Sequence, residues 1–345
     1  MKIDIFTHIF PKSCLSKMRK AAPDELARRK RTSDTIYPSI VDLDERFRIM
    51  DMFDEYVQVI CLGWPPIEVF GPPPVSTDLA RFANDGMAEL VHKYPDRFLG
   101  FIASLPMNDP EGLLTETNRA IKELGAVGVQ VFTNILGRPL TTSETMPLFD
   151  LMADLDRPIW MHPTRWPDFP DYKGEPKSHY DIWWAFGWPY ETSAAMTHLI
   201  FSGLFDRHPD IKIITHHLGG MIPYFEGRIG PGWVLFGTRD SDEDNTLSLK
   251  KLKKRPIDYF HLFYGDTALT GAREATICGL KFFGSDRTLF GTDMPYDHEN
   301  GLAVIRWTIE IIDSLDIKPA ERQAIYEGNA RQLIKLKKLH SPRVM

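Results

Sequence analysis

Short apolar runs alternate with longer amphipathic segments along almost the whole chain. Eight of the runs have the length of strands, and several are apolar throughout, as in a sheet covered on both faces. Most of the segments between them carry apolar residues at helical spacing; residues 43–53, for example, place Phe47, Met50 and Phe53 on one side. Strands separated by helices favour a parallel sheet, because parallel neighbours need a long crossover.

Eight strand–helix units predict an α/β fold of the (β/α)8 TIM-barrel type, whose active sites lie at the C-terminal strand ends. Residues 12–42 have little periodicity and are predicted to be an insertion after the first strand. We expect one domain over residues 1–338, with C-terminal helices and a tail over 339–345. The predicted strands end at His8 or cover residues 56–62, 97–105, 127–132, 158–161, 212–215, 259–265 and 288–291.

Four of these strands end in His or Asp, followed within a few residues by Pro or Gly. The four residues are His8, His162, His217 and Asp293. Imidazole and carboxylate groups are the usual ligands of zinc, manganese and iron. One histidine alone is usually an ordinary polar residue, but four such strand ends predict one shared metal site. We expect His8, His162 and Asp293 as ligands and His217 as a proton-transfer group. His216 should point away from His217 if the strand continues, which favours a packing or supporting role.

Composition narrows the possible partners and the compartment. The net charge is −6 and no basic block suggests nucleic-acid binding; the basic run at 28–31 is expected to be a solvated loop or helix end. No apolar run is long enough for a membrane span, and the N-terminus lacks the pattern of a signal peptide. The 3 cysteines are far apart, which favours reduced thiols and a cytoplasmic protein.

Several motifs resemble the amidohydrolase-related family that includes aminocarboxymuconate-semialdehyde decarboxylase and the hydroxybenzoate decarboxylases. The resemblance extends over almost the whole chain and implies the same barrel. It is specific for the family and much less specific for the substrate. The matching segments are residues 3–11, 47–52, 161–163, 199–209, 217–220, 290–295 and 326–330.

The resemblance also assigns roles at the strand ends. The family has His-x-His or Glu-x-His after the first strand, a ligand histidine after the fifth, a catalytic histidine after the sixth and an aspartate after the eighth. His8, His162 and Asp293 then resemble ligands, and His217 resembles the catalytic histidine. The first ligand position falls on Phe6, which cannot ligate, so the metal has three protein ligands, binds weakly or is absent. The fourth strand has no lysine for a second metal, so the resemblance implies one divalent ion, zinc first and manganese second.

Three further residues match substrate positions of the family or lie near them. Arg48 matches an arginine that binds a substrate carboxylate; the alternative is a surface salt bridge. Trp184, with its neighbouring tryptophans, is placed to stack on a planar ring, or else belongs to loop packing or a dimer contact. Arg228 matches an arginine that reaches a neighbouring subunit's site, which implies a homodimer; the alternative is a local pair with Glu226 or Asp206.

The resulting hypothesis is a non-oxidative decarboxylase of a small aromatic or unsaturated carboxylate. Asp293 or His217 would deliver a proton to the carbon that loses carbon dioxide. A first alternative is a hydrolase or hydratase of a small cyclic or carboxylate substrate, with Asp293 as general base toward a metal-activated water. A second alternative is a non-catalytic carboxylate binder, because Phe6 replaces a ligand. Metal analysis and product identification separate the three.

Overall fold

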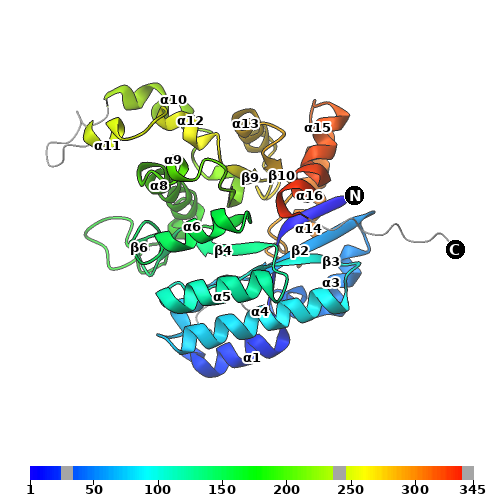
Figure 1. The fold of residues 1–345 in the computed structure, drawn as a ribbon. Helices are drawn as coiled ribbons and strands as arrows, with labels where there is room; N and C mark the ends of the chain where they lie inside the picture. Colours follow the sequence, from blue (N-terminus) through cyan, green and yellow to red (C-terminus); the bar gives the residue numbers. More distant parts are fainter. Residues whose placement is uncertain (25–33, 236–245, 336–345) are drawn as a thin grey trace.

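The structure is a computed structural model that describes residues 1–24, 34–235 and 246–335. Within these ranges the main element is a parallel sheet of eight strands whose neighbours follow one another along the chain (Figure 1). A small antiparallel hairpin pairs β5 (Asn134–Ile135) with β6 (Arg138–Pro139). The parallel strands are β1 (Lys2–Ile9), β2 (Tyr56–Leu62), β3 (Phe98–Ala103), β4 (Gly128–Phe132), β7 (Ile159–His162), β8 (Ile213–Thr215), β9 (Tyr264–Asp266) and β10 (Thr288–Leu289).

The sheet closes into a barrel where β1 meets the segment that follows β10. The backbone N–H of Ile5 donates to the carbonyl of Phe290, and that of His8 donates to the carbonyl of Met294. In the opposite direction, the N–H of Asp293 donates to the carbonyl of Phe6. The closure therefore brings the C-terminal end of β1 beside Asp293, as the predicted (β/α)8 barrel requires.

Helices cover the outside of the barrel, and their ends follow local rules. Asp109 accepts a hydrogen bond from the N–H of Gly112 (3.0 Å) and precedes Pro110, so α5 begins there. The α-helices are α1 (Lys12–Ala21), α3 (Leu43–Met50), α4 (Val75–Lys93), α5 (Pro110–Lys122), α6 (Met146–Asp154), α7 (Ile182–Ala185), α8 (Gly187–Phe201), α9 (Leu204–Arg207), α10 (Glu226–Ile229), α11 (Thr246–Lys250), α12 (Pro256–Phe260), α13 (Arg273–Phe283), α14 (Leu302–Ser314), α15 (Pro319–Gln323) and α16 (Asn329–Ile334). Shorter turns are the 3₁₀ helices η2 (Pro38–Ile40), η3 (Ile67–Phe70), η4 (His216–Gly219) and η5 (Pro231–Leu235), and the π-helix η6 (Ala324–Gly328).

One predicted strand is placed wrongly. We expected a strand over residues 259–265, but α12 occupies Pro256–Phe260 and β9 starts only at Tyr264. Pro256 stands in the first turn of α12, where its fixed φ favours a helix and its missing N–H costs nothing. The apolar run that follows this proline is therefore split between a helix, a turn and a three-residue strand.

The predicted insertion over residues 12–42 contains α1, which packs on the outer side of α4 (Figure 1), and the short turn η2. The basic run at 28–31 and the tail over 339–345 lie outside the described residues. The domain boundaries therefore stay a prediction.

None of the helices within the described residues has the length and apolar character that a membrane span needs.

Candidate metal centre and active site

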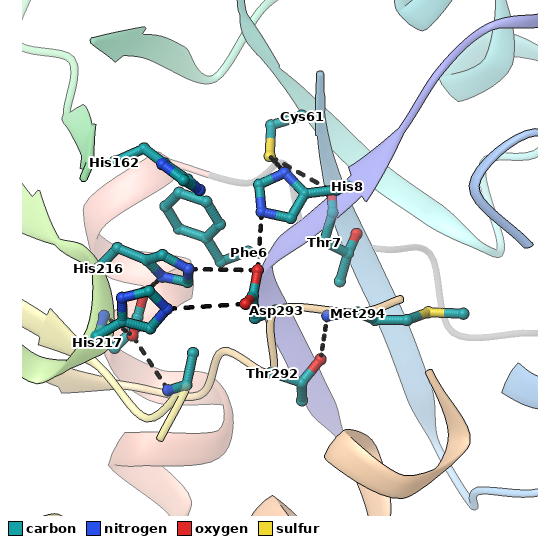
Figure 2. A network of polar contacts seen from close by, with 12 residues as sticks. Phe6, Thr7, His8, Cys61, His162, His216, His217, Thr292, Asp293 and Met294 are labelled. Carbon is teal, nitrogen blue, oxygen red and sulfur yellow. Dashed lines mark hydrogen bonds and ion pairs between the residues drawn. The ribbon is translucent and has the colours of Figure 1, made fainter. Parts of the chain in front are cut away.

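Four buried side chains converge where the strands end (Figure 2). His8 is on β1, His162 is the last residue of β7, His216 follows β8, and Asp293 follows β10. Each offers one nitrogen or oxygen atom, and these atoms all lie within 4.8 Å of one another. Three of the four are the predicted ligands His8, His162 and Asp293. They meet because the carboxyl ends of parallel strands share one end of a barrel.

The three histidines of this group are held by their Nδ1 atoms. Nδ1 of His162 lies 2.6 Å from the carbonyl oxygen of Pro163, and Nδ1 of His216 lies 2.5 Å from a carboxylate oxygen of Asp266. Nδ1 of His8 lies 3.4 Å from the carbonyl of Leu62. When Nδ1–H donates in each case, Nε2 keeps a lone pair. Metal-binding histidines are oriented in this way by their second nitrogen.

The atoms at the centre of the group lack ordinary hydrogen bonds. Oδ1 of Asp293 is 3.0 Å from Nε2 of His8 and 3.4 Å from Nε2 of His216 (Figure 2). Despite these short distances, the three atoms are buried without a well-aligned hydrogen bond. Buried polar atoms are rarely left in this state. A divalent cation would satisfy all of them, so the residues present fit a metal ion.

The fourth strand supports a single ion. Where two-metal relatives would need a lysine, the segment after residue 128 reads Val129-Gln-Val-Phe-Thr133. The cluster therefore provides for one divalent ion, with imidazole and carboxylate donors that suit zinc, manganese or iron.

The group has strongly shifted pKa values. Burial lowers the pKa of His8 and, with repulsion from the neighbouring histidines, lowers that of His162 far more. Burial opposes ionisation of Asp293, but the imidazoles of His216, His217 and His8 that face its carboxylate hold its pKa well below the usual range. Burial also opposes the charged form of His216, yet the carboxylates of Asp266 and Asp293 raise its pKa to about 9. Neutral imidazole and ionised carboxylate are the forms that bind a metal; His8, His162 and Asp293 have these forms, and His216 would release its proton when an ion binds.

The expected orientation of His216 is wrong. Strand β8 ends at Thr215, so side-chain alternation does not extend to the two histidines. His217 has a left-handed backbone (φ 54°, ψ 43°), as does Leu218 (φ 50°, ψ 43°). This turn places the rings of His216 and His217 only 3.8 Å apart. Consecutive left-handed residues other than glycine are strained, and such strain concentrates at functional sites.

His217 lies at the edge of the group and not within it. Its Nε2 is 3.7 Å from Oδ2 of Asp293, and its side chain is 19% exposed, whereas that of His216 is fully buried. Burial and repulsion from His216 lower the pKa of His217. The residue is therefore within reach of Asp293 through one bridging water and is open enough to meet a substrate.

A cluster of aromatic side chains, called the aromatic wall below, lies beside the histidines and consists of Trp64, Phe132, Trp166, Trp183 and Trp188. The ring of Trp188 lies 5.3 Å from that of His162 and 6.5 Å, nearly parallel, from that of His217. Trp64 and Phe132 form a buried cluster with Trp188. Trp166 and Trp183 pack against that cluster. Trp64 and Trp166 were missed, because each belongs to a loop whose path the sequence does not reveal.

The predicted substrate residue Trp184 is outside this wall. It belongs to the short helix α7 and is 45% exposed, whereas its neighbour Trp183 is packed against the buried tryptophans. Successive helical residues point about 100° apart, so the two side chains cannot face the same surface.

Neither of the two predicted substrate arginines is among the four residues of the metal group. Arg48 is on α3 with an exposed side chain, and its guanidinium makes two hydrogen bonds of 2.8 Å with Glu45. This is the surface salt bridge that the sequence left as the alternative, and the carboxylate-binding role of Arg48 stays a prediction. Arg228 is on α10 and lines a groove with Tyr190 and Met221.

A parallel eight-stranded barrel with a buried His/Asp group at its strand ends defines a metal-dependent enzyme of the barrel class. The chain belongs to the amidohydrolase family: the model of that family, described as "Amidohydrolase", matches residues 63–336.

Similar proteins have decarboxylase names. Gamma-resorcylate decarboxylase of Polaromonas sp. (strain JS666) is 34% identical over 310 residues, covering 85% of this chain and 87% of its own. The 2-amino-3-carboxymuconate-6-semialdehyde decarboxylase of Dictyostelium discoideum is 29% identical over 316 residues (86% and 82%). A solved Polaromonas sp. JS666 dihydroxybenzoic acid decarboxylase, with bound manganese and the inhibitor 2-nitroresorcinol, superposes with a TM-score of 0.77, at 28% identity and 98% coverage of both chains.

Proposed function

We propose that this chain is a metal-dependent, non-oxidative decarboxylase of a small aromatic or unsaturated carboxylate. The observation that carries the proposal is the buried group of unpaired nitrogen and oxygen atoms at the strand ends, directly beside a wall of tryptophans. The decarboxylase names of the similar proteins support the same reaction.

His8, His162 and Asp293 would hold the metal ion, with zinc proposed first and manganese second. Manganese in the similar Polaromonas structure supports an ion of this class without deciding between the two. A bound ion would supply Lewis-acid stabilisation and orientation of a substrate oxygen. The neutral state of His8 and His162, which burial favours, keeps the imidazole lone pairs free for that role.

The chain's own residues would deliver a proton. During decarboxylation the bond between the ring carbon and the carboxylate carbon breaks, and its electron pair stays on the ring carbon. That carbon then gains a proton, and carbon dioxide leaves. Asp293 and His217 are the two catalytic candidates. Nε2 of His217 and Oδ2 of Asp293 lie 3.7 Å apart, so a proton would pass between them through one bridging water and be replaced from solvent.

Trp188 would position a planar substrate. Its ring lies close to those of both His162 and His217, so a flat molecule held against it would face the proton-transfer group. Because aromatic rings pack favourably in offset or tilted arrangements, this wall suits a benzoate better than a flexible aliphatic acid. Trp184 is half exposed and is not one of the residues proposed to contact the substrate in its own subunit.

We also propose a homodimer in which Arg228 reaches the partner's site. Tyr190, which is 55% exposed, lines the same groove as Arg228, and Phe186 (65%) and Tyr224 (81%) are further exposed aromatic side chains. Exposed aromatic residues and arginine are enriched in the centres of protein interfaces. A cytoplasmic location is supported by Cys14, Cys61 and Cys278, which are free thiols.

The test is product identification with metal-loaded protein. Manganese- and zinc-loaded samples should convert hydroxybenzoates, 2,6-dihydroxybenzoate among them, to the phenol with an equal amount of carbon dioxide. His217→Asn should lose this turnover, and Arg255→Ala, which removes an exposed salt bridge with Asp258, should retain it.

Two outcomes would overturn the proposal. Acid or amine formed from lactones or amides without carbon dioxide would establish a hydrolase. Absence of turnover combined with a ligand-dependent rise in melting temperature would establish a carboxylate binder.

A further inference from the structure

Phe6 and His216 form a stacked pair at the metal group. Their ring centroids are 4.0 Å apart and their planes differ by 15°. The Phe6 ring also lies 5.3 Å from the ring of His8 and 5.8 Å from that of His162 (Figure 2). Phe6 therefore occupies the first-ligand position, facing the group but without an atom that can bind a metal.

His216 provides a donor atom in the same group from a different strand end. Its ring comes from the turn after β8, and its Nε2 is one of the four atoms that lie within 4.8 Å of one another. That nitrogen is buried without a hydrogen bond and lies 3.4 Å from Oδ1 of Asp293. The donor atom that Phe6 cannot provide on β1 is thus matched by Nε2 of His216 in the same group.

Asp266 fixes the His216 ring. The carboxylate is fully buried at the end of β9; Oδ2 lies 2.5 Å from Nδ1 of His216. Its Oδ1 accepts hydrogen bonds from the backbone N–H groups of His217 (3.0 Å) and Ala268 (3.1 Å). Both oxygens are therefore committed, and the carboxylate cannot turn toward the centre of the group. A carboxylate behind a histidine is the usual support of a metal ligand.

We propose that the first metal ligand has moved from β1 to the turn after β8, so that His216 completes a set of His8, His162, His216 and Asp293. Asp266 is the positioning residue of the new ligand, and Phe6 is the surface on which its ring rests. This inference builds on the proposed function, because it concerns the same divalent ion.

The decisive variants exchange the two positions. Zinc and manganese affinities are measured by chelator competition for the wild type, His216→Ala, Phe6→His and the double variant Phe6→His/His216→Ala. Changes behind a ligand typically cost 10- to 100-fold in affinity, so loss of the ligand itself in His216→Ala should cost more than ~100-fold. The double variant should recover to within ~10-fold of the wild type, because histidine returns to the facing position on β1.

Two further variants control the interpretation. Asp266→Asn keeps the volume of the side chain and should weaken binding by ~10- to 100-fold, even if His216→Ala proves too unstable to purify. His217→Ala removes the adjacent ring, which is outside the four-atom group, and should stay within ~3-fold of the wild-type affinity. Circular dichroism of each metal-free variant verifies that the barrel is folded.

X-ray absorption of the zinc-loaded protein provides a readout that does not depend on activity. The inference predicts three imidazole ligands in the wild type, two in His216→Ala and three again in the double variant. Wild-type affinity in His216→Ala, or two imidazoles in the wild type, would overturn it and show that His216 only pairs with carboxylates. If the metal affinity of the double variant did not recover, the proposal that His216 replaces the ligand lost at residue 6 would be overturned. Three imidazoles without decarboxylation would leave this inference standing and reject the proposed function.

Discussion

Asp4 and Asp293 are both buried aspartates in polar surroundings, but their partners differ. The two oxygens of Asp4 receive hydrogen bonds from the hydroxyls of Tyr56 and Thr292 (2.5 Å each) and from the backbone N–H groups of Phe6 (3.2 Å) and Thr292 (3.1 Å). Asp293 faces three histidines, and its Oδ1 has no well-aligned hydrogen bond. Groups of the protein itself provide hydrogen bonds to both oxygens of Asp4, whereas Oδ1 of Asp293 has no well-aligned hydrogen-bond donor among the described residues.

The difference separates a structural carboxylate from a functional one. Burial raises the pKa of Asp4 to about 7, although its hydrogen bonds oppose the change. The pKa of Asp293 is instead held well below its usual range, because the three histidines that face it outweigh the effect of burial. A carboxylate that stays ionised beside imidazole groups can bind a cation, whereas one that takes up a proton within its own hydrogen-bond network cannot do so in that state.

The largest effect is expected from Asp293→Asn. The amide keeps the shape but removes the charge, so zinc and manganese affinity should fall by more than ~100-fold and turnover should be lost. Chelator competition and product assays measure both. His162→Ala should lower metal content in the same way. Retention of a full equivalent of metal in either variant would exclude that residue as a ligand.

Asp4→Asn should act on stability and leave metal affinity unchanged. The folded protein keeps a proton on Asp4 up to about pH 7, whereas the unfolded chain loses it near pH 3.8. Folding is therefore favoured at low pH, and this contribution is lost as pH rises through 7. From pH 5 to 7 the unfolding free energy of the wild type should fall by about 2 kcal/mol relative to the variant.

Denaturant titrations at several pH values measure this difference. Asp258→Asn, at a surface aspartate paired with Arg255, should run parallel to the wild type over the same interval. If the Asp4→Asn curve also ran parallel to the wild type, Asp4 would be ionised in the folded protein and its contrast with Asp293 would be lost.

A smaller recovery of activity is expected from mixed subunits. Arg228→Ala keeps the metal group, and Asp293→Ala keeps Arg228, so a dimer of one chain of each kind would rebuild one complete site. Equal mixing should restore at most about a quarter of wild-type turnover, since half of the dimers are mixed and each has one working site. Absence of any recovery, with subunit exchange shown by fluorescence transfer, would confine Arg228 to its own subunit.

Sequence reasoning was most accurate where it relied on strand ends. His8, His162 and Asp293 could be placed together because a parallel barrel gathers all its carboxyl strand ends at one side. It was wrong for His216, because alternation predicts opposite faces only while a strand continues. The left-handed residues that bring His216 and His217 together are not glycines, so no residue in this segment indicates the turn.

Contacts between loops could also not be predicted from the sequence. Trp64 and Trp166 join Trp188 from separate loops, and no periodicity connects such positions. Arg48 was tied to a substrate through resemblance alone, whereas spacing already offered Glu45 three residues earlier on the same helix as a partner. Pro256 could have revealed the start of α12, because proline is favoured in the first helical turn.

The central claim is that this group of histidines and Asp293 holds one divalent ion. Elemental analysis of the protein, purified without chelators and then equilibrated with zinc or manganese, tests it most directly. The account predicts one tightly held equivalent per chain in the wild type and a large loss in Asp293→Asn, with Asp4→Asn retaining the full equivalent. A wild type that stays below a tenth of an equivalent after equilibration would contradict it.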